Sequence, residues 1–177
     1  MRLFVAIAMP EEVSASLLTL QSGVPGARWT TREQMHLTLR FIGECDGRAA
    51  AGIDDALASL SARPFSLALK SVGQFGGRKP SSLWAGVESD ELLFRLQRKI
   101  EIAVQRAGLP AETRKFTPHV TLARLKSAST GRVMDYIADH GLYRSPAFEV
   151  GNFILYSSQP TPNGSLYVAE RSYTLRG

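Results

Sequence analysis

The four residues His36-Leu37-Thr38-Leu39 recur later in the chain as His119-Val120-Thr121-Leu122. Each copy reads histidine, aliphatic, threonine, aliphatic, and the two copies contain two of the chain's three histidines. Because side chains alternate between the two faces of a β-strand, each copy places His and Thr on one face and the aliphatic residues on the other. The aliphatic faces belong in a core. The two His/Thr faces are therefore predicted to line one polar cleft.

The segments around the two copies follow the same order: strand, helix, His-containing strand, helix, strand. The opening strands, near Leu3 and Leu83, have nearly the same separation as His36 and His119, which indicates a degenerate internal repeat. A closing pair of strands around a Pro/Gly-rich turn favours antiparallel pairing. We therefore expect an α+β fold, bilobal and pseudo-twofold, with two antiparallel-type sheets flanked by helices and a central cleft carrying both His-x-Thr strands. The expected strands are 2–8, 35–42, 65–69, 82–87, one opening at Pro118, 148–156 and 166–175; the expected helices are 11–21, 46–61, 91–107 and 130–140, with a loop at 23–31 and a flexible basic turn at 73–80.

Length and composition fit one domain, residues 1–177, made of two intimate lobes, since 44% of the 177 residues are hydrophobic. No apolar run approaches the roughly 18 residues of a membrane-spanning helix, so a soluble protein without membrane association is expected. Cys45 is the only cysteine, which excludes an internal disulfide and suits a reducing, cytoplasmic setting. The net charge of +5 favours polyanionic partners, although an ordinary soluble protein with a modest basic bias would carry the same charge.

Paired imidazoles across a cleft suit acid–base chemistry at phosphorus. Imidazole has an ordinary pKa of about 6.5, so one ring can take a proton from a nucleophile while the other protonates a leaving oxygen. A Thr hydroxyl on the same face can hold a non-bridging phosphate oxygen. A two-His metal site would need a third ligand, and His140 has neither a cysteine partner nor a carboxylate at ligand spacing. No metal and no cofactor are expected.

The doubled motif resembles that of the 2H phosphoesterase superfamily, and within it the bacterial and archaeal RNA 2′,3′-cyclic phosphodiesterases once called 2′–5′ RNA ligases. The likeness extends from the opening strand 2–7 through His36–Glu44 and Phe116–Arg124 to the closing region 148–167. It implies a bilobal fold and hydrolysis of a terminal RNA 2′,3′-cyclic phosphate to a 2′-phosphate. It also implies that His36 is the proton donor, that His119 is the proton acceptor, and that Thr38 and Thr121 hold the phosphate.

Three further residues are candidates for substrate binding. The resemblance carries over Arg124, but its offset of five from His119 places it on the opposite face of a regular strand, unless the strand ends or bulges there. Arg40 lies four residues after His36 and has the right parity, although it could equally be a solvated Arg at a strand end. Phe4, together with Trp29 and Phe116, is a candidate for stacking on a terminal base, with core packing as the alternative for Phe4.

The expected partner is RNA with 2′,3′-cyclic phosphate ends, and a monomer is the default for a two-lobed chain of this size. Weak 2′–5′ ligation by the reverse reaction is a minor expected activity. The alternatives are a phosphodiesterase for a 2′–5′ oligonucleotide or a small cyclic nucleotide, and an RNA-binding module that has lost catalysis. The presence of both His and both Thr argues against the last.

Overall fold

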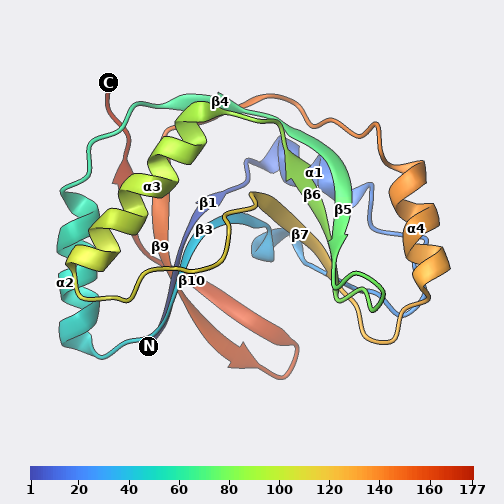
Figure 1. Ribbon diagram of the computed structural model, residues 1–177, viewed down its shortest axis with the longest axis horizontal. Coiled ribbons are helices and arrows are strands. Elements are labelled where there is room, and N and C mark those ends of the chain that lie inside the picture. The colour runs from blue at the N-terminus through green and yellow to red at the C-terminus, as the bar shows by residue number, and fades with distance from the viewer.

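The computed structural model describes residues 1–177 and confirms a mixed α+β fold in which every strand pair is antiparallel (Figure 1). The strands are β1 (Arg2–Ala8), β2 (Arg28–Trp29), β3 (His36–Glu44), β4 (Phe65–Leu67), β5 (Leu69–Phe75), β6 (Ser82–Val87), β7 (His119–Arg124), β8 (Phe148–Val150), β9 (Asn152–Thr161) and β10 (Gly164–Thr174). The helices are α1 (Glu11–Leu18), α2 (Gly47–Ala58), α3 (Glu91–Arg106) and α4 (Thr130–Asp139), with a 3₁₀ turn, η1, at Arg32–Gln34.

The strands divide into two groups that meet at the His-containing strands. Seven strands follow one another in the order β10-β9-β1-β3-β7-β6-β5, with β2 also paired to β7, and β4 and β8 form a separate two-stranded sheet. Between β3 and β7 the only paired residues are Leu37 and Val120. We call β10, β9, β1 and β3 the first lobe, and β7, β6, β5 and β2 the second.

Each lobe contains strands from both halves of the chain. By their place along the chain, β1, β3 and β5 of the first half are equivalent to β6, β7 and β9 of the second half. The pairing crosses the halves: β5 of the first half pairs with β6 of the second, and β9 of the second half pairs with β1 of the first. The helices are exchanged as well: α3 of the second half lies beside α2 over the first lobe, and α1 lies on the same side as α4, over the second (Figure 1). Neither half therefore completes a lobe by itself.

Local sequence explains why the helices form where they do. Asp46, Asp90 and Ser129 cap the N-termini of α2, α3 and α4 by accepting hydrogen bonds from backbone N–H groups of the first turn. The apolar face of α3 is fully buried, as its periodicity predicts, through Leu93, Leu96, Ile100 and Val104. No helix in the structure has both the length and the apolar character needed to cross a membrane.

Both His strands contain a β-bulge at the same place in the motif. In β3, Thr38 pairs with Ala6 while Arg40 pairs with Val5, so Leu39 is an extra residue. In β7, Thr121 pairs with Trp84 while Ala123 pairs with Leu83, so Leu122 is the extra residue. A bulge reverses the alternation of side chains beyond it. The fourth residue after each His consequently faces the core, and the fifth faces the cleft.

Some expected boundaries were wrong. Helices α1 and α2 end about three residues earlier than predicted, and the loop at 23–31 contains the short strand β2. The turn expected from residue 73 starts later, because β5 continues to Phe75. Gly73 belongs to this strand, and a Cβ at this position would overlap the indole ring of Trp84. Here glycine serves close packing rather than flexibility.

Candidate active site

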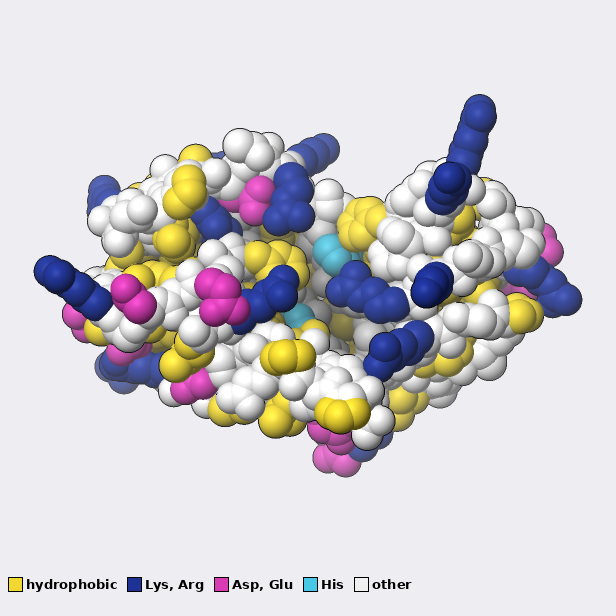
Figure 2. Space-filling view, turned by 90° about the horizontal axis from the view of Figure 1, so that it is seen from below, with side chains coloured by type: hydrophobic (Ala, Val, Ile, Leu, Met, Phe, Trp, Pro, Cys, Tyr) yellow, Lys and Arg dark blue, Asp and Glu magenta, His cyan; other side chains and the backbone are white.

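The two His-x-Thr motifs lie where the two lobes meet. The single pair Leu37–Val120 is centred between the motifs, and continuing its antiparallel register by one residue sets His36 opposite Thr121 and Thr38 opposite His119. Seen from below, two histidine side chains are visible in a central hollow, with Lys and Arg side chains gathered around it (Figure 2). The predicted pseudo-twofold arrangement of the four side chains is therefore present.

The wall around His36 is aromatic. The ring centroid of His36 lies 4.8 Å from that of Phe4, 5.1 Å from that of Tyr167 and 6.1 Å from that of Tyr156. Burial lowers the pKa of His36 to about 4, because an apolar surrounding disfavours the imidazolium; a hydrogen bond with the backbone of Gln34 acts in the opposite direction. His36 is consequently neutral at pH 7 in the absence of a ligand.

His119 has a similar environment in the second lobe. Its ring centroid lies 4.8 Å from that of Phe75 and 6.1 Å from that of Trp84. Burial is again the main reason that its pKa is lowered. The ring Nδ1 lies 2.7 Å from the backbone oxygen of Thr117, and since a carbonyl oxygen only accepts, Nδ1 carries the hydrogen. In the neutral ring Nε2 is then unprotonated and free to accept a proton.

Two hollows lie on the two sides of the histidines. One, of about 320 Å³, contains Thr38 and His119; the rings of Phe41, Phe75 and Phe116 line it, and so do charged side chains, namely Arg40, Glu112, Arg114 and Lys115. We call it the aromatic hollow. The other, of about 220 Å³, contains Thr121 and is mostly polar; its remaining lining residues are Arg28, Trp29, Thr30, Gln34, Arg124, Gly164, Ser165 and Tyr167. Neither Thr38 nor Thr121 uses its hydroxyl in a hydrogen bond within the protein; Thr121 accepts one from Thr30 through its backbone oxygen instead. Both hydroxyls are thus available to a ligand.

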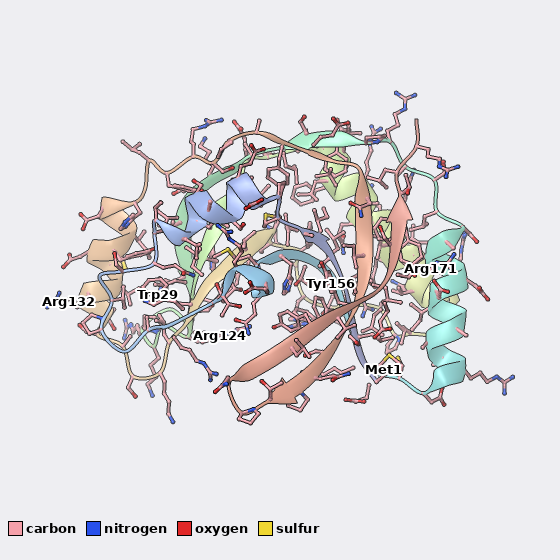
Figure 3. All side chains as sticks on the ribbon, turned by 180° about the vertical axis from the view of Figure 1, so that it is seen from behind. Met1, Trp29, Arg124, Arg132, Tyr156 and Arg171 are labelled. Atoms are coloured by element: carbon pink, nitrogen blue, oxygen red, sulfur yellow. The ribbon has the colours of Figure 1, made fainter.

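Arg124 reaches the cleft because of the bulge at Leu122. In a regular strand Arg124 would point away from His119. A bulge is the alternative that the sequence allows, and the structure has one. Its side chain is exposed, makes no ion pair, and lies beside the cleft near the second lobe (Figure 3). Its positive charge contributes to lowering the pKa of both His36 and His119. The guanidinium is therefore close enough to act on both rings.

Arg40 borders the hollow that contains His119, but its guanidinium is bound to protein acceptors, and the prediction that it binds substrate is corrected to a supporting role. The bulge at Leu39 turns it toward the core, where it is 8% exposed and its Nε lies 2.5 Å from a carboxylate oxygen of Glu101. It also donates to the backbone oxygens of Phe41 and Pro110. Glu101 in turn accepts from the backbone N–H of Glu112. Arg40 and Glu101 thus hold the chain segment that forms one wall of the aromatic hollow.

Phe4 is also corrected from a base-stacking residue to a supporting one. Its ring is 4% exposed, because Tyr156 stacks on it at 5.2 Å and Tyr167 meets it edge-on at 5.1 Å. A substrate base has no access to either face. Phe4 instead packs against the His36 ring. Trp29 lines the polar hollow and Phe116 the aromatic one.

Several residues of the site are not predictable from the sequence. Tyr156 and Tyr167 come from the β9–β10 hairpin and reach His36 only because β9 pairs with β1, with Tyr156 directly opposite Phe4. Arg28 lies in a segment that reads as a loop. No local pattern signals these contacts, since they arise from pairing between distant strands. The structure contains no group of three or more His, Cys, Asp or Glu side chains arranged to hold a metal ion.

Comparison with known proteins agrees with this architecture. The model of the LigT-like phosphoesterase family matches residues 7–84 and again residues 86–167. The chain belongs to this family. The two matches coincide with the two halves that share the His-x-Thr motif. Membership makes the protein a phosphoesterase, that is, a hydrolase.

Curated relatives in this family cover nearly the whole chain. The chain is 34% identical to an RNA 2′,3′-cyclic phosphodiesterase of Thermotoga maritima, over 94% of this chain and 91% of that protein. It is 32% identical to one of Thermus thermophilus, over 100% of this chain and 91% of that protein. Among solved structures, TT0787 of T. thermophilus has a TM-score of 0.83 at 29% identity, covering 100% of this chain and 99% of its own. LigT of E. coli, solved with 3′-AMP, has a TM-score of 0.82 at 22% identity, covering 99% and 98%, and this likeness supports the fold.

Proposed function

We propose that this phosphoesterase hydrolyses the terminal 2′,3′-cyclic phosphate of RNA to a 2′-phosphate without a metal, using His36 as proton donor and His119 as proton acceptor. The observation that carries the proposal is the Leu37–Val120 pair, which centres the two His-x-Thr motifs on a single cleft. The names of the curated relatives support the substrate. The assignment of donor and acceptor comes from the resemblance to the superfamily.

The step begins with His119. Its neutral ring has Nδ1 held by the backbone oxygen of Thr117, so Nε2 accepts a proton from water as the water oxygen attacks phosphorus. The bond between phosphorus and the 3′ oxygen breaks, and that oxygen takes a proton from His36. The phosphate stays on the 2′ oxygen. His119 has then gained one proton and His36 has lost one, and exchange with water restores both.

The charge state needed for this step arises when the substrate binds. His36 must be protonated to act as an acid, yet in the free protein burial lowers its pKa to about 4. A cyclic phosphate carries a negative charge, and an opposite charge beside an imidazole favours the imidazolium and raises its pKa. Thr38 and Thr121 would donate hydrogen bonds to the non-bridging oxygens, and Arg124 would offset charge that develops on them.

The two alternative functions use the same site. One is hydrolysis of a 2′–5′ oligonucleotide or a small cyclic nucleotide. Weak 2′–5′ ligation is a side activity of the same site: a 5′ hydroxyl would attack phosphorus in place of water, and the 3′ oxygen would leave. The other is RNA binding without turnover. All four motif residues are present and face one cleft, which favours catalysis over binding alone.

The test incubates purified protein in EDTA with a short RNA that ends in a 2′,3′-cyclic phosphate, and mass spectrometry with phosphatase treatment locates the phosphate on the product. His36→Ala and His119→Ala are each expected to lose roughly 10²–10⁴-fold in rate. His140→Ala is the matched control, because His140 lies at the end of α4, outside the two hollows. Conversion to a 2′-phosphate that both cleft variants lose and the control keeps is the expected result. No turnover, turnover abolished by EDTA, or turnover that survives either cleft substitution would overturn the proposal.

A further inference from the structure

Two arginines, Arg28 and Arg124, line the polar hollow beside the active site. Arg28 on β2 is directly paired with Arg124 on β7, so their side chains emerge on the same face of the sheet. Like charges placed directly opposite on antiparallel strands destabilise the pair. Neither Arg28 nor Arg124 forms an ion pair with a carboxylate, and no acidic side chain lines the hollow that the two share. An anion between the two would relieve this repulsion.

The Arg28 side chain is exposed and lies beneath the tip of the β9–β10 hairpin. A Cβ placed on Gly164 would be 3.1 Å from a terminal guanidinium nitrogen of Arg28, and Gly164 has a φ of +117°. The hairpin tip is tied to η1 by a hydrogen bond from the side chain of Gln34 to the backbone oxygen of Ser165. A side chain at position 164 would therefore be strained by the backbone conformation and would displace the end of the Arg28 side chain.

The two arginines are not equivalent with respect to the histidines. The charge of Arg124 contributes to lowering the pKa of both His36 and His119, whereas Arg28 is not among the groups that shift either. Arg124 is on β7, the strand of His119, whereas Arg28 is on the neighbouring strand β2. The hollow adjoins the active site, because it contains Thr121 and Tyr167, and Tyr167 packs against His36. It offers a place for an anion next to the cyclic phosphate.

The chemistry of the substrate supplies such an anion. The terminal ribose carries the cyclic phosphate on its 2′ and 3′ oxygens and is joined through its 5′ oxygen to the next phosphodiester. The hollow that contains Thr38 and His119 has the rings of Phe41, Phe75 and Phe116 in its lining, which suit a base. Of its three cationic side chains, Arg40 and Arg114 are paired with Glu101 and Glu112, which leaves Lys115, whereas both arginines of the polar hollow lack an ion pair. Guanidinium groups suit phosphate oxygens, to which they can donate two hydrogen bonds at once.

We propose that Arg28, together with Arg124, binds the phosphodiester on the 5′ side of the terminal nucleotide, so that the enzyme acts preferentially on RNA ends rather than on free nucleoside 2′,3′-cyclic phosphates. The inference rests on the proposed hydrolysis of cyclic phosphate ends. It sets the direction of the RNA strand across the cleft, with the 5′ chain leaving over β2 and the tip of the β9–β10 hairpin.

The test compares kcat/KM for three substrates: a nucleoside 2′,3′-cyclic phosphate with a free 5′ hydroxyl, a dinucleotide ending in the same cyclic phosphate, and that dinucleotide with a neutral methylphosphonate linkage. The wild-type protein is expected to prefer the phosphodiester dinucleotide, and Arg28→Gln to reduce the ratio of dinucleotide to mononucleotide kcat/KM about tenfold, since a charge-assisted hydrogen bond is lost. The methylphosphonate is expected to lose the same preference with the wild-type protein. Arg32→Gln is the matched control: it removes the same charge four residues away, outside the hollow, where Arg32 pairs with Glu11, and it should leave the ratio unchanged.

The outcomes separate this inference from the proposed function. If the mononucleotide is hydrolysed but the dinucleotide has no advantage, or the advantage survives both Arg28→Gln and the methylphosphonate, the subsite is overturned and the proposed function stands. If Arg28→Gln and Arg32→Gln lower the ratio of dinucleotide to mononucleotide kcat/KM equally, the preference reflects general attraction between the basic protein and the dinucleotide, and the subsite is also overturned. If no cyclic phosphate is hydrolysed, both proposals fail.

Discussion

The charge of Arg124 lowers the pKa of both histidines, so removing it should change the pH dependence of the reaction. Because its charge lowers the pKa of His36 and His119, Arg124→Gln is expected to raise both values and to move the limbs of the kcat/KM profile to higher pH. The loss of a charge-assisted contact to phosphate should also raise KM about tenfold. Arg132→Gln, on α4 at the far end of the molecule, is the control (Figure 3). An unchanged pH profile in Arg124→Gln would contradict this role.

His36 should also make the protein sensitive to mild acid. Its pKa is about 4 in the folded protein and 6.5 in an ordinary setting, so between these values the unfolded chain binds more protons. Stability contributed by the neutral, buried ring is therefore complete above pH 6.5 and is lost as the pH falls toward 4, by at most about 3 kcal/mol.

Urea unfolding at a series of pH values measures this effect. The wild-type protein is expected to lose stability between pH 6.5 and 4, and His36→Gln to show a flatter dependence in that window. Comparing the two proteins at about pH 8, where the ring is neutral whether or not the chain is folded, corrects for any packing effect of the substitution. Parallel pH dependences of the two proteins would contradict the buried, neutral state of His36.

At the scale of elements, the paired bulges decide which side chains face the substrate. Sequence alternation correctly places His and Thr on one face, because these residues precede the bulges. It fails for the next positions: it predicts Arg40 in the cleft and Arg124 on the opposite face, whereas Arg40 lies in the core and Arg124 beside the cleft. A bulge is a relation between two strands, so the sequence of one strand does not reveal it. In both strands the extra residue is the last one of the motif, Leu39 in β3 and Leu122 in β7.

The ion pair of Arg40 and Glu101 links β3, α3 and the segment before β7. Both side chains are largely buried, and Arg40 holds the pKa of Glu101 at about 2. Arg40→Met alone would leave a carboxylate poorly compensated, and we expect a loss of roughly 3–5 kcal/mol in the free energy of unfolding. The double variant Arg40→Met/Glu101→Leu should lose clearly less, as measured by chemical denaturation. Equal losses in the single and the double variant would show that the pair does not act as a unit.

At the scale of the molecule, the exchange of strands and helices between halves makes each lobe depend on the whole chain. The internal repeat is readable from two motifs at matching positions, and it predicts the symmetry of the cleft. It does not predict that β5 joins β6, or that the hairpin carrying Tyr156 and Tyr167 joins β1, since partners among antiparallel strands are chosen by tertiary packing. The hollow around Arg28 depends on the same exchange, and for that reason no pattern along the chain indicates it.

We propose from this topology that residues 1–177 unfold as one cooperative unit. Native-state hydrogen exchange in low denaturant measures the opening of each lobe separately, through amides of β1 and β9 in one and of β6 and β7 in the other. The most protected amides of both lobes are expected to report the same free energy and the same dependence on denaturant. One lobe opening at a distinctly lower free energy would contradict a single unit.

The division of labour between the two histidines is tested most directly with an RNA whose terminal cyclic phosphate has sulfur in place of the bridging 3′ oxygen. A thiolate leaves without taking up a proton, so this substrate needs a base but no acid. His36→Ala is expected to lose at least about 100-fold in rate on the oxygen substrate but to come within about tenfold of the wild-type protein on the sulfur substrate, whereas His119→Ala stays impaired on both. Recovery of His119→Ala but not of His36→Ala, or equal losses on both substrates, would contradict the assignment.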